Sequence, residues 1–530
     1  MLFWLTACQK NNKQFSKNKK PNFIVIVLDD LDFDELNFYH SDTFPCYYGA
    51  LKNGIESARN VSVAKANFYM PNLDKLASKS AIFTHFYANS SVCTPVRYAL
   101  LTGKHAWKSP FIDKETPINQ PAFIKWNSFI SPDEETIIKP LHDRGYKAAI
   151  IGKWHNGANG KDIRIPMSKE ELLKPEITEV IKNDYDYFVR FLKDSIGFDY
   201  VDRIFYDNPY ILNLEWITEG VKIFIDKYKD EPFYLYLPLP FPHAQYYDYK
   251  EFDPLATPAG MLSKAPDAGH SLKNAQYKNK LHTGNNNFSM ATWIDDFIGI
   301  VYQQLEKYGL DQNTMIIFTS DQQTRGKFTC YESLRIPTFI YYPPLIKNQT
   351  YIHDLCLIND VVPTIFEIID NKALANNPYD GISLLPVITN KKNDKWRKDI
   401  FVEISYCKAV VTKKYKYIAA RPPAMVWQNL QKDSSEAIKE NRRRKVSWDG
   451  QNWNWPGVVY DNDRDFPYYF DKDQLYDLEN DIFEQKNLAY LPEYKDILAE
   501  MKENLLKQMI NYPFYFGEFS SEKRNKYLTK

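Results

Sequence analysis

The sequence predicts an α/β fold, with a large mixed, mostly parallel sheet sandwiched by helices and a smaller antiparallel sheet after it. Residues 21 to about 387 alternate short apolar runs with helical patterns, which is typical of a parallel sheet covered by helices. After Pro386 the pattern changes to short β-rich pieces between charged turns, which indicates an antiparallel sheet. Hydrophobic residues make up 44% of the 530 residues, so the chain can bury a large core.

Five apolar runs are the candidate strands of the large sheet. The longest, Phe23–Leu28, is too short to cross a membrane, which takes about 20 apolar residues, and we interpret it as a buried strand. The other candidate strands are Ala148–Ile151, Phe233–Leu237, Met315–Thr319 and Thr338–Tyr341. Helices with Pro at the start or Gly after the end are predicted at Met70–Ser80, Glu135–Asp143 and Trp293–Tyr308.

The C-terminal part is predicted as a separate α+β subdomain. Its strands are expected at Ile400–Ile404, Ala409–Thr412, Tyr415–Ile418 and Gln474–Leu478, with a terminal helix near Tyr494–Met509. We therefore divide the chain into an N-terminal linker at 1–20, a large α/β domain at 21–390 and a C-terminal subdomain at 391–530.

Charge and cysteine usage exclude several classes of protein. The 67 basic and 67 acidic residues cancel, so no net field would recruit nucleic acid. The six cysteines contain no C-x-x-C pair, which argues against a zinc or thioredoxin-like site.

The N-terminus resembles a bacterial lipoprotein signal. Leu5-Thr-Ala-Cys8 matches a lipobox, and a polar linker runs from there to Lys20. The charged n-region and longer apolar h-region of a signal peptide are missing, so we expect a truncated signal, with a disordered tail carrying a chance cysteine as the alternative. The first interpretation implies lipid on Cys8 and a periplasmic or outer-membrane-anchored protein of a Gram-negative bacterium.

Polar side chains follow four of the apolar runs at the point where each ends. In an open α/β sheet the ligand crevice lies beyond the carboxyl ends of the strands, so these residues are expected to share one site. They are Asp29 and Asp30, Lys153 and His155, His243, and Asp321 and Gln322.

Residues 91–103, Ser-Val-Cys-Thr-Pro-Val-Arg-Tyr-Ala-Leu-Leu-Thr-Gly, resemble the signature of the formylglycine-dependent (type I) sulfatases of the alkaline phosphatase superfamily. That signature is Cys-x-Pro-x-Arg followed by a helix ending in Leu-Thr-Gly. Further blocks match in order, which makes chance agreement implausible and implies an alkaline-phosphatase-like fold. They include Asp29-Asp30, Gly152-Lys153-Trp154-His155, Pro242-His243, Ser320-Asp321, Gly326-Lys327 and Asp380-Gly381.

The resemblance implies that Cys93 is the nucleophile after oxidation to formylglycine. A thiolate would leave a thiosulfate-like adduct with no easy exit, whereas one hydroxyl of the hydrated aldehyde attacks sulfur and the other drives elimination of sulfate. A formylglycine-generating or an anaerobic sulfatase-maturating enzyme would carry out the oxidation.

Carboxylate and amide oxygens point to a hard divalent ion, Ca²⁺ or Mg²⁺. The resemblance implies that Asp29, Asp30, Asp321, Gln322 and the modified Cys93 hold it. Asn most often stands in the family where this chain has Gln322.

The resemblance also assigns the cationic residues. Arg97 and Lys153 match residues that hold the formylglycine, and His155 lies two residues further on. His243 and Lys327 match the sulfate-binding pair, with a histidine as candidate general acid.

These residues predict a sulfatase that hydrolyses a sulfate monoester on a carbohydrate. One alternative is a phosphonate monoester or phosphodiester hydrolase with the same Cys-x-Pro-x-Arg core. The other is a non-catalytic glycan-binding relative. Trp427, Trp448, Trp453 and Trp455 with the basic run 442–445 are either a sugar-binding surface or a solvated turn beside an aromatic subcore.

Overall fold

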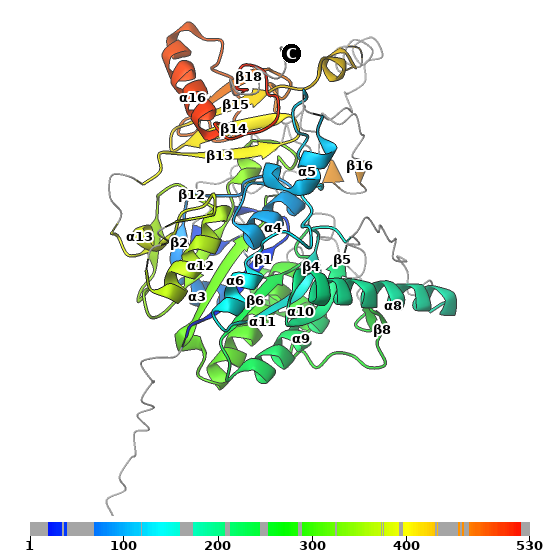
Figure 1. The fold of residues 1–530 in the computed structure, drawn as a ribbon. Coiled ribbons are helices and arrows are strands. Elements are labelled where there is room, and N and C mark those ends of the chain that lie inside the picture. Colours follow the sequence, from blue (N-terminus) through cyan, green and yellow to red (C-terminus); the bar gives the residue numbers. More distant parts are fainter. Residues whose placement is uncertain are drawn as a thin grey trace, which may run out of the picture.

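The computed structural model of the protein describes most of the chain from residue 20 onwards. The described residues are 20–33, 36–39, 68–117, 119–158, 173–206, 212–243, 253–284, 289–323, 326–372, 374, 376–391, 396–429, 432, 454–455, 458–459 and 466–520. Figure 1 shows a large sheet wrapped by helices, with a small sheet and the helix α16 stacked above one end of it.

The large sheet has eight strands in the order β11-β2-β10-β9-β1-β6-β4-β5. The strands β9, β1, β6, β4 and the edge strand β5 run parallel, and β10 is antiparallel to both of its neighbours. This confirms the predicted mixed, mostly parallel sheet. The strands are β1 (Asn22–Leu28), β2 (Ala81–Phe83), β4 (Lys147–Trp154), β5 (Tyr200–Tyr206), β6 (Phe233–Pro238), β9 (Thr314–Ser320), β10 (Thr338–Tyr341) and β11 (Thr350–Ile352).

The five predicted strands are all present, and β4 exceeds its predicted length the most. The run at Ala148–Ile151 continues as β4 to Trp154, through a register shift between Ile151 and Gly152. Gly152 has φ +121°, and a Cβ there would meet the carbonyl oxygen of Pro238. Only glycine permits this close approach, which keeps Lys153 within the strand.

The apolar side chains of β1 alternate between the two faces of the large sheet, and helices cover both faces. Phe23, Val25 and Val27 face a core shared with α4, α6, α8 and α12. Ile24, Ile26 and Leu28 face the opposite core, shared with α3, α9 and α11. These helices are α3 (Pro71–Ala77), α4 (Cys93–Thr102), α6 (Ile138–Asp143), α8 (Pro175–Arg190), α9 (Leu214–Tyr228), α11 (Ser289–Lys307) and α12 (Val361–Asp370).

The three predicted helices correspond to α3, α6 and α11, with ends shifted by up to four residues. The sequence patterns do not predict α8, α9 or α10 (Leu272–Thr283). Shorter elements complete this part: α5 (Pro110–Glu115), α13 (Leu385–Ile388), the pair β3 (Phe86–Tyr87) and β12 (Cys356–Leu357), and the pair β7 (Ala256–Thr257) and β8 (Gly260–Met261).

The small sheet is antiparallel throughout, with the order β13-β14-β15-β18, as predicted. Its strands are β13 (Asp399–Ile404), β14 (Cys407–Thr412), β15 (Tyr415–Ala420) and β18 (Asp473–Asp477), followed by α16 (Lys495–Gln508). A further short pair joins β16 (Asn454–Trp455) and β17 (Val458–Val459).

The small sheet shares both of its cores with the first part of the chain. One face packs against Val92, Tyr331 and Leu334, and the other packs against α16 together with Ala106 and Ile112. The boundary near residue 390 falls between α13 and β13 and stays a prediction.

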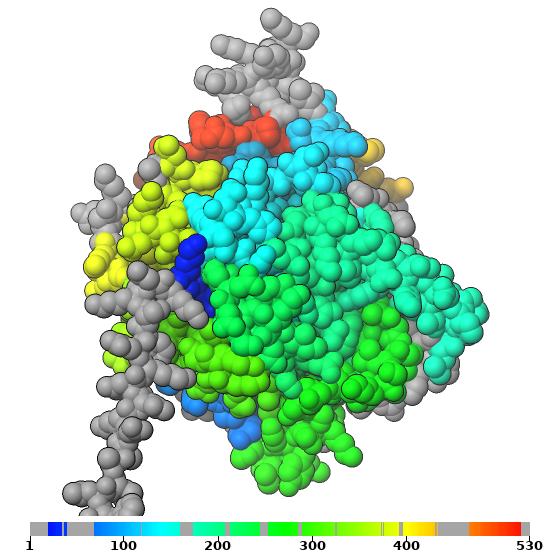
Figure 2. All heavy atoms as spheres, turned by 60° about the horizontal axis from the view of Figure 1, so that its bottom comes forward, coloured from blue at the N-terminus to red at the C-terminus, as the bar shows by residue number. Residues whose placement is uncertain are grey.

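Figure 2 views the end of the molecule opposite the small sheet. The segment that leads into β1 (dark blue) reaches the surface there as a narrow strip between neighbouring segments, while β1 itself is buried. Because β1 begins at that end, the carboxyl ends of the parallel strands point toward the small sheet.

Several predictions fall outside the described residues, among them the lipobox with Cys8 and the cluster with Trp448, Trp453 and the basic run 442–445. The described cysteines, Cys93, Cys330, Cys356 and Cys407, are free thiols. Among the described residues, no helix is both long enough and apolar enough to cross a membrane.

Candidate active site

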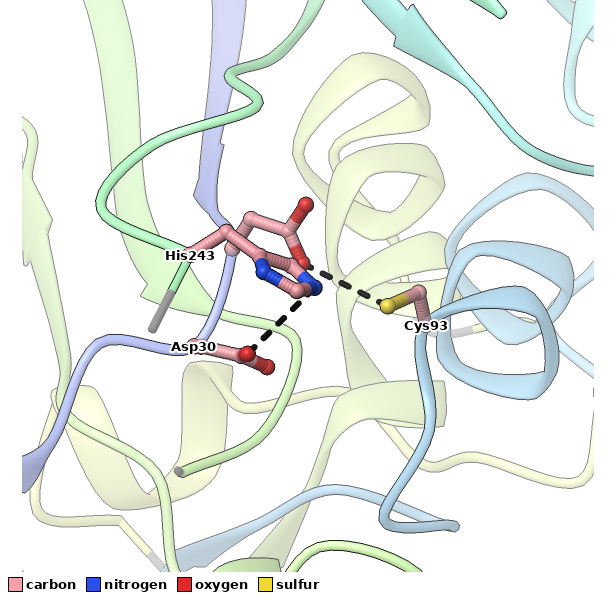
Figure 3. A group of neighbouring side chains, drawn as sticks. Asp30, Cys93 and His243 are labelled. Atoms are coloured by element: carbon pink, nitrogen blue, oxygen red, sulfur yellow. Dashed lines mark hydrogen bonds and ion pairs between the residues drawn. The ribbon is translucent and has the colours of Figure 1, made fainter. Parts of the chain in front are cut away.

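The carboxyl ends of four neighbouring parallel strands bring the predicted polar residues together. Asp29 and Asp30 follow β1, Asp321 and Gln322 follow β9, His243 lies beyond β6, and Lys153 is in the last part of β4. The N-terminus of α4 completes the cluster with Cys93, as Figure 3 shows for Asp30, Cys93 and His243. The sheet order thus confirms that these residues share one place in the fold.

Cys93 is the first residue of α4 and is 1% exposed. Its Sγ lies 3.4 Å from Oδ1 of Asp29, 3.4 Å from Nε2 of Gln322 and 3.8 Å from Nζ of Lys153. The N-terminal end of a helix favours negative charge, so this position suits a group that carries charge during a reaction.

Asp29 and Asp30 are buried carboxylates held by lysines. Lys153 Nζ lies 2.5 Å from Asp29 Oδ2, and Lys327 Nζ lies 2.8 Å from both oxygens of Asp30. Burial by itself raises the pKa of Asp29, but Lys153, His243 and Arg97 together outweigh it and hold that pKa well below its usual range. Both acids therefore stay ionised at neutral pH. Asp30 also has φ +62°, an uncommon backbone conformation that is often found at functional sites.

Arg97 connects Asp321, which follows β9, to Asp29, which follows β1. It lies four residues after Cys93 in α4, hence on the same side of the helix, and is fully buried. Its Nη2 lies 2.8 Å from Asp321 Oδ2 and 3.8 Å from Asp29 Oδ2. Burial, with the neighbouring Asp29 and Cys93, raises the pKa of Asp321 well above its usual value despite this contact with Arg97.

The orientation of the Gln322 amide indicates whether the cluster is suited to a cation. Its Nε2 donates to Asp30 Oδ1 and to Cys93 Sγ, while its Oε1 is buried without a hydrogen-bond donor. Turning the amide by half a rotation would exchange the two atoms and point Oε1 at the carboxylate, which a cation between the two oxygens would stabilise. The residues therefore fit a divalent ion.

Four possible ligand atoms lie close enough to share one ion. They belong to Asp29, Asp30, Cys93 and His243, and all lie within 4.8 Å of one another. No other such group of three or more His, Cys, Asp or Glu side chains occurs in the part of the chain that the structure describes. The group includes His243, which the sequence analysis assigned to sulfate binding, beside three of the five predicted ligands.

His243 and Lys327 form the predicted pair. Lys327 Nζ lies 3.2 Å from His243 Nε2, which is in turn 3.5 Å from Asp30 Oδ2. Burial and the nearby Lys327 lower the pKa of His243 to about 4, so the imidazole is neutral at neutral pH. The side chains of His243 and Lys153 are 17% and 13% exposed, whereas those of Asp29 and Asp30 are at most 1% exposed. The cluster is therefore reached from solvent past His243 and Lys153.

His155 lies one residue beyond β4 and is half-buried. The adjacent Asn156 donates from Nδ2 to the carbonyl oxygens of Thr94 and Ser128. These bonds tie the end of β4 to the start of α4, and the role of His155 stays a prediction.

The structure adds two aromatic residues that the sequence analysis did not select. Phe328 follows Lys327 with φ +68°, and its ring makes an edge contact with Trp126 at a centroid distance of 5.0 Å. Phe328 could have been selected from the sequence because it follows Lys327. No sequence pattern connects Trp126 with the cluster.

The profile of the Sulfatase family matches residues 21–371, and a second profile, of the C-terminal region of N-sulphoglucosamine sulphohydrolase, matches residues 325–444. The chain belongs to the sulfatase family and is a sulfuric ester hydrolase of the alkaline phosphatase superfamily.

Among curated proteins, an ulvan-active sulfatase of Formosa agariphila is 23% identical over 526 residues, covering 96% of this chain and 83% of the relative. A putative sulfatase of Bacteroides fragilis has a solved structure that matches with a TM-score of 0.58 and 18% identity, covering 96% of this chain and 99% of that one. A protein solved in complex with its substrate D-glucosamine-2-N,6-O-disulfate matches with a TM-score of 0.53 and 17% identity, covering 93% and 98% of the two chains.

Proposed function

We propose that this sulfatase removes sulfate monoesters from a sulfated carbohydrate, with Cys93, converted to formylglycine, as the nucleophile. The observation that carries the proposal is the position of Cys93 at the start of α4, within 3.4 Å of Asp29 and Gln322 and 3.8 Å of Lys153. The ulvan-active relative and the complex with a glucosamine disulfate support a carbohydrate as the substrate.

The chain's own residues would divide the work as follows. Lys153 and Arg97 would stabilise the negative charge of Asp29 and of the modified residue 93. These contacts would keep the nucleophile oriented toward the opening. His243 lies at the opening with the buried Lys327 3.2 Å from it, and the two would bind the sulfate oxygens. A histidine, His243 or His155, would deliver a proton to the leaving alcohol, and His243 would first have to take up a proton because its pKa is lowered to about 4.

A divalent ion, Ca²⁺ or Mg²⁺, would be held by Asp29, Asp30, Asp321, Gln322 and residue 93. When bound, it would neutralise the negative charge that develops on the sulfate oxygens. Hard carboxylate ligands favour these ions over softer metals. Exhaustive dialysis against EDTA should abolish sulfate release and added Ca²⁺ or Mg²⁺ should restore it, and full activity after chelation would contradict the ligand set.

The charge of the cluster does not by itself separate sulfate from phosphate esters. A bound divalent ion would favour the ionised form of Asp321 as well, and Arg97, Lys153 and Lys327 would then match the charges of three carboxylates, which leaves a surplus of about two positive charges from the ion. Phosphate carries nearly two negative charges at neutral pH and sulfate esters carry one, and both are attracted. We propose a preference for sulfate because the matching family and the ulvan-active relative are sulfatases, while the charge of the cluster favours neither ester.

Maturation can be tested apart from activity. Co-expression with a formylglycine-generating or an anaerobic sulfatase-maturating enzyme should convert the thiol of Cys93 to an aldehyde, seen by mass spectrometry of the tryptic peptide and by hydrazide labelling. Unmodified Cys93 in an enzyme that still releases sulfate would contradict the proposed nucleophile.

The substrate class is tested by comparing kcat/KM on matched sugar sulfates and sugar phosphates, and on an aryl phosphonate and a phosphodiester. Sulfate esters should be preferred by a wide margin. A phosphorus ester that exceeds every sulfate tested would favour the ester-hydrolase alternative.

We also propose that Cys8 is lipidated and anchors the enzyme in the periplasm or at the outer membrane. The lipobox-like Leu5-Thr-Ala-Cys8 supports this. Radiolabelled palmitate should enter the wild-type protein and not Cys8→Ala, when each is expressed with a complete signal peptide in front.

A further inference from the structure

A second pocket lies at the junction between α5 and the hairpin that joins β13 to β14. Its volume is about 320 Å³, which is at the lower end of the range for small-molecule sites. Its lining includes Glu115, Gln120, Phe123, Lys125, Asn127 and Tyr406. In Figure 1, α5 lies between α4 and the small sheet, on the side of the molecule toward which the strands of the large sheet point.

The segment that lines this pocket also borders the catalytic cluster. Trp126, between the lining residues Lys125 and Asn127, contacts Phe328, the residue after Lys327. Ser128 accepts a hydrogen bond of 3.1 Å from Asn156, the residue after His155. Trp126 and Ser128 are therefore immediate chain neighbours of the lining residues Lys125 and Asn127, and their partners Phe328 and Asn156 are immediate neighbours of Lys327 and His155.

The chemistry of the lining suits a charged sugar. The half-buried rings of Phe123 and Tyr406 lie 4.6 Å apart between centroids, and Lys125 Nζ lies 5.5 Å from the centroid of Phe123. Aromatic faces pack against the C–H surfaces of sugar rings, while an ammonium group binds an anionic substituent.

Asn127 holds this segment in place before any ligand binds. It is 8% exposed. Its Oδ1 accepts from the backbone of Lys125 at 2.9 Å, and its Nδ2 donates to Glu115 Oε2 at 3.1 Å and to the carbonyl of Phe123 at 3.0 Å. A pre-formed site loses less conformational entropy on binding than a mobile one.

We propose that this pocket is a glycan subsite for an anionic sugar residue of the substrate other than the one that carries the scissile sulfate. The stacking rings are Phe123 and Tyr406, Lys125 binds a sulfate or a carboxylate on that residue, and Trp126 and Phe328 line the path to the cluster. The inference rests on the proposed function and makes an oligosaccharide, rather than a monosaccharide, the preferred substrate.

The test compares Tyr406→Ala and Lys125→Gln with wild type on sulfated monosaccharides and tetrasaccharides prepared from ulvan and from glycosaminoglycans. Each variant should lower kcat/KM for the tetrasaccharide about tenfold and leave that for the monosaccharide within about twofold. Tyr277→Ala is the matched control, because Tyr277 is a 70% exposed tyrosine on α10. Equal losses of kcat/KM on the monosaccharide and the tetrasaccharide, or no loss on either, would overturn the proposed subsite.

Calorimetric binding separates this proposal from the proposed function. In a Cys93→Ala background the tetrasaccharides should bind about tenfold more weakly when Tyr406→Ala is added, and unchanged binding overturns the subsite whatever the activity. Binding with no sulfate release by the matured wild type contradicts the proposed function alone. Desulfated tetrasaccharides and carboxyl-reduced tetrasaccharides then show which anionic group depends on Lys125.

Discussion

The catalytic cluster and the small C-terminal sheet both bury charged side chains, but they arrange them differently. In the small sheet each lysine lies against one glutamate: Lys408 Nζ is 3.2 Å from Glu403, and Lys416 Nζ is 2.7 Å from Glu484. The exposed fraction of these four side chains is at most 2%. In the cluster, Asp29 lies near both Lys153 and Arg97, and part of Lys153 is exposed to solvent.

The difference shows that buried charges can either stabilise the fold or prepare a site for a ligand. A closed pair of opposite charges offers no net charge to a ligand, although removing one partner leaves the other charge buried without its counter-charge. In the cluster, three carboxylates are held near one another by cations, an arrangement that makes sense if a further cation and an anionic substrate bind there. Activity should therefore depend on the cluster, and stability should depend on the pairs.

The largest expected effect is that of Cys93→Ala. Sulfate release should fall by a factor of about 10³ or more, equal to about 4 kcal/mol of transition-state stabilisation, because the nucleophile is lost. The melting temperature should change little. Cys356→Ala is the matched control, since Cys356 is a buried free thiol in β12, away from the cluster, and its loss should lower stability but keep activity. Retained activity in Cys93→Ala would end the hypothesis.

Lys408→Met should show the opposite pattern. It leaves Glu403 buried without its partner, so the free energy of unfolding in urea should fall by about 3–5 kcal/mol. The kcat/KM of the folded fraction should stay near that of wild type. Adding Glu403→Gln should recover part of the loss, and a Lys408→Met enzyme as stable as wild type would show that the pair is dispensable.

Within the cluster, Asp321→Ala should reduce activity more than Gln322→Ala. Asp321 contributes a full charge and holds Arg97 at 2.8 Å, whereas Gln322 contributes a neutral amide. We expect kcat/KM to fall about 10²–10³-fold for Asp321→Ala and about tenfold for Gln322→Ala. Excess Ca²⁺ should restore more activity to Gln322→Ala than to Asp321→Ala. The reverse order would remove Asp321 from the proposed ligand set.

The smallest effect concerns pH. Burial raises the pKa of Glu484 to about 7, only partly offset by Lys416, from a usual value of 4.5. The folded state therefore holds a proton that the unfolded state has released, so this contribution to stability is complete below pH 4.5 and is lost as the pH rises to about 7. The loss amounts to about 3 kcal/mol at most. Glu484→Gln should flatten the slope of unfolding free energy between pH 4.5 and 7, and an unchanged slope would assign that slope to other groups.

Much of the large sheet could be predicted because buried parallel strands are continuous apolar runs. Phe23–Leu28 and Thr338–Tyr341 are found almost as predicted. The helices α8 and α10 were missed because their mean composition is polar, and only the neighbours that they pack against reveal which face is buried.

The candidate site was predictable to a similar extent. Its members follow strands or stand in a short motif, and both are local features of the chain. The metal-ligand group containing His243 was not predicted, since that residue lies beyond β6, and its distance from Cys93 depends on the sheet order.

The sequence alone determined the class of fold and the inventory of reactive residues, because strand periodicity and the spacing Cys93-x-Pro-x-Arg97 are properties of neighbouring residues. Only the tertiary structure decided which charges meet. The pairing of Lys327 with Asp30, of Arg97 with Asp321 and of Trp126 with Phe328 joins residues far apart in the chain. Such contacts depend on the order of strands and on packing between the two sheets, and no local pattern encodes them.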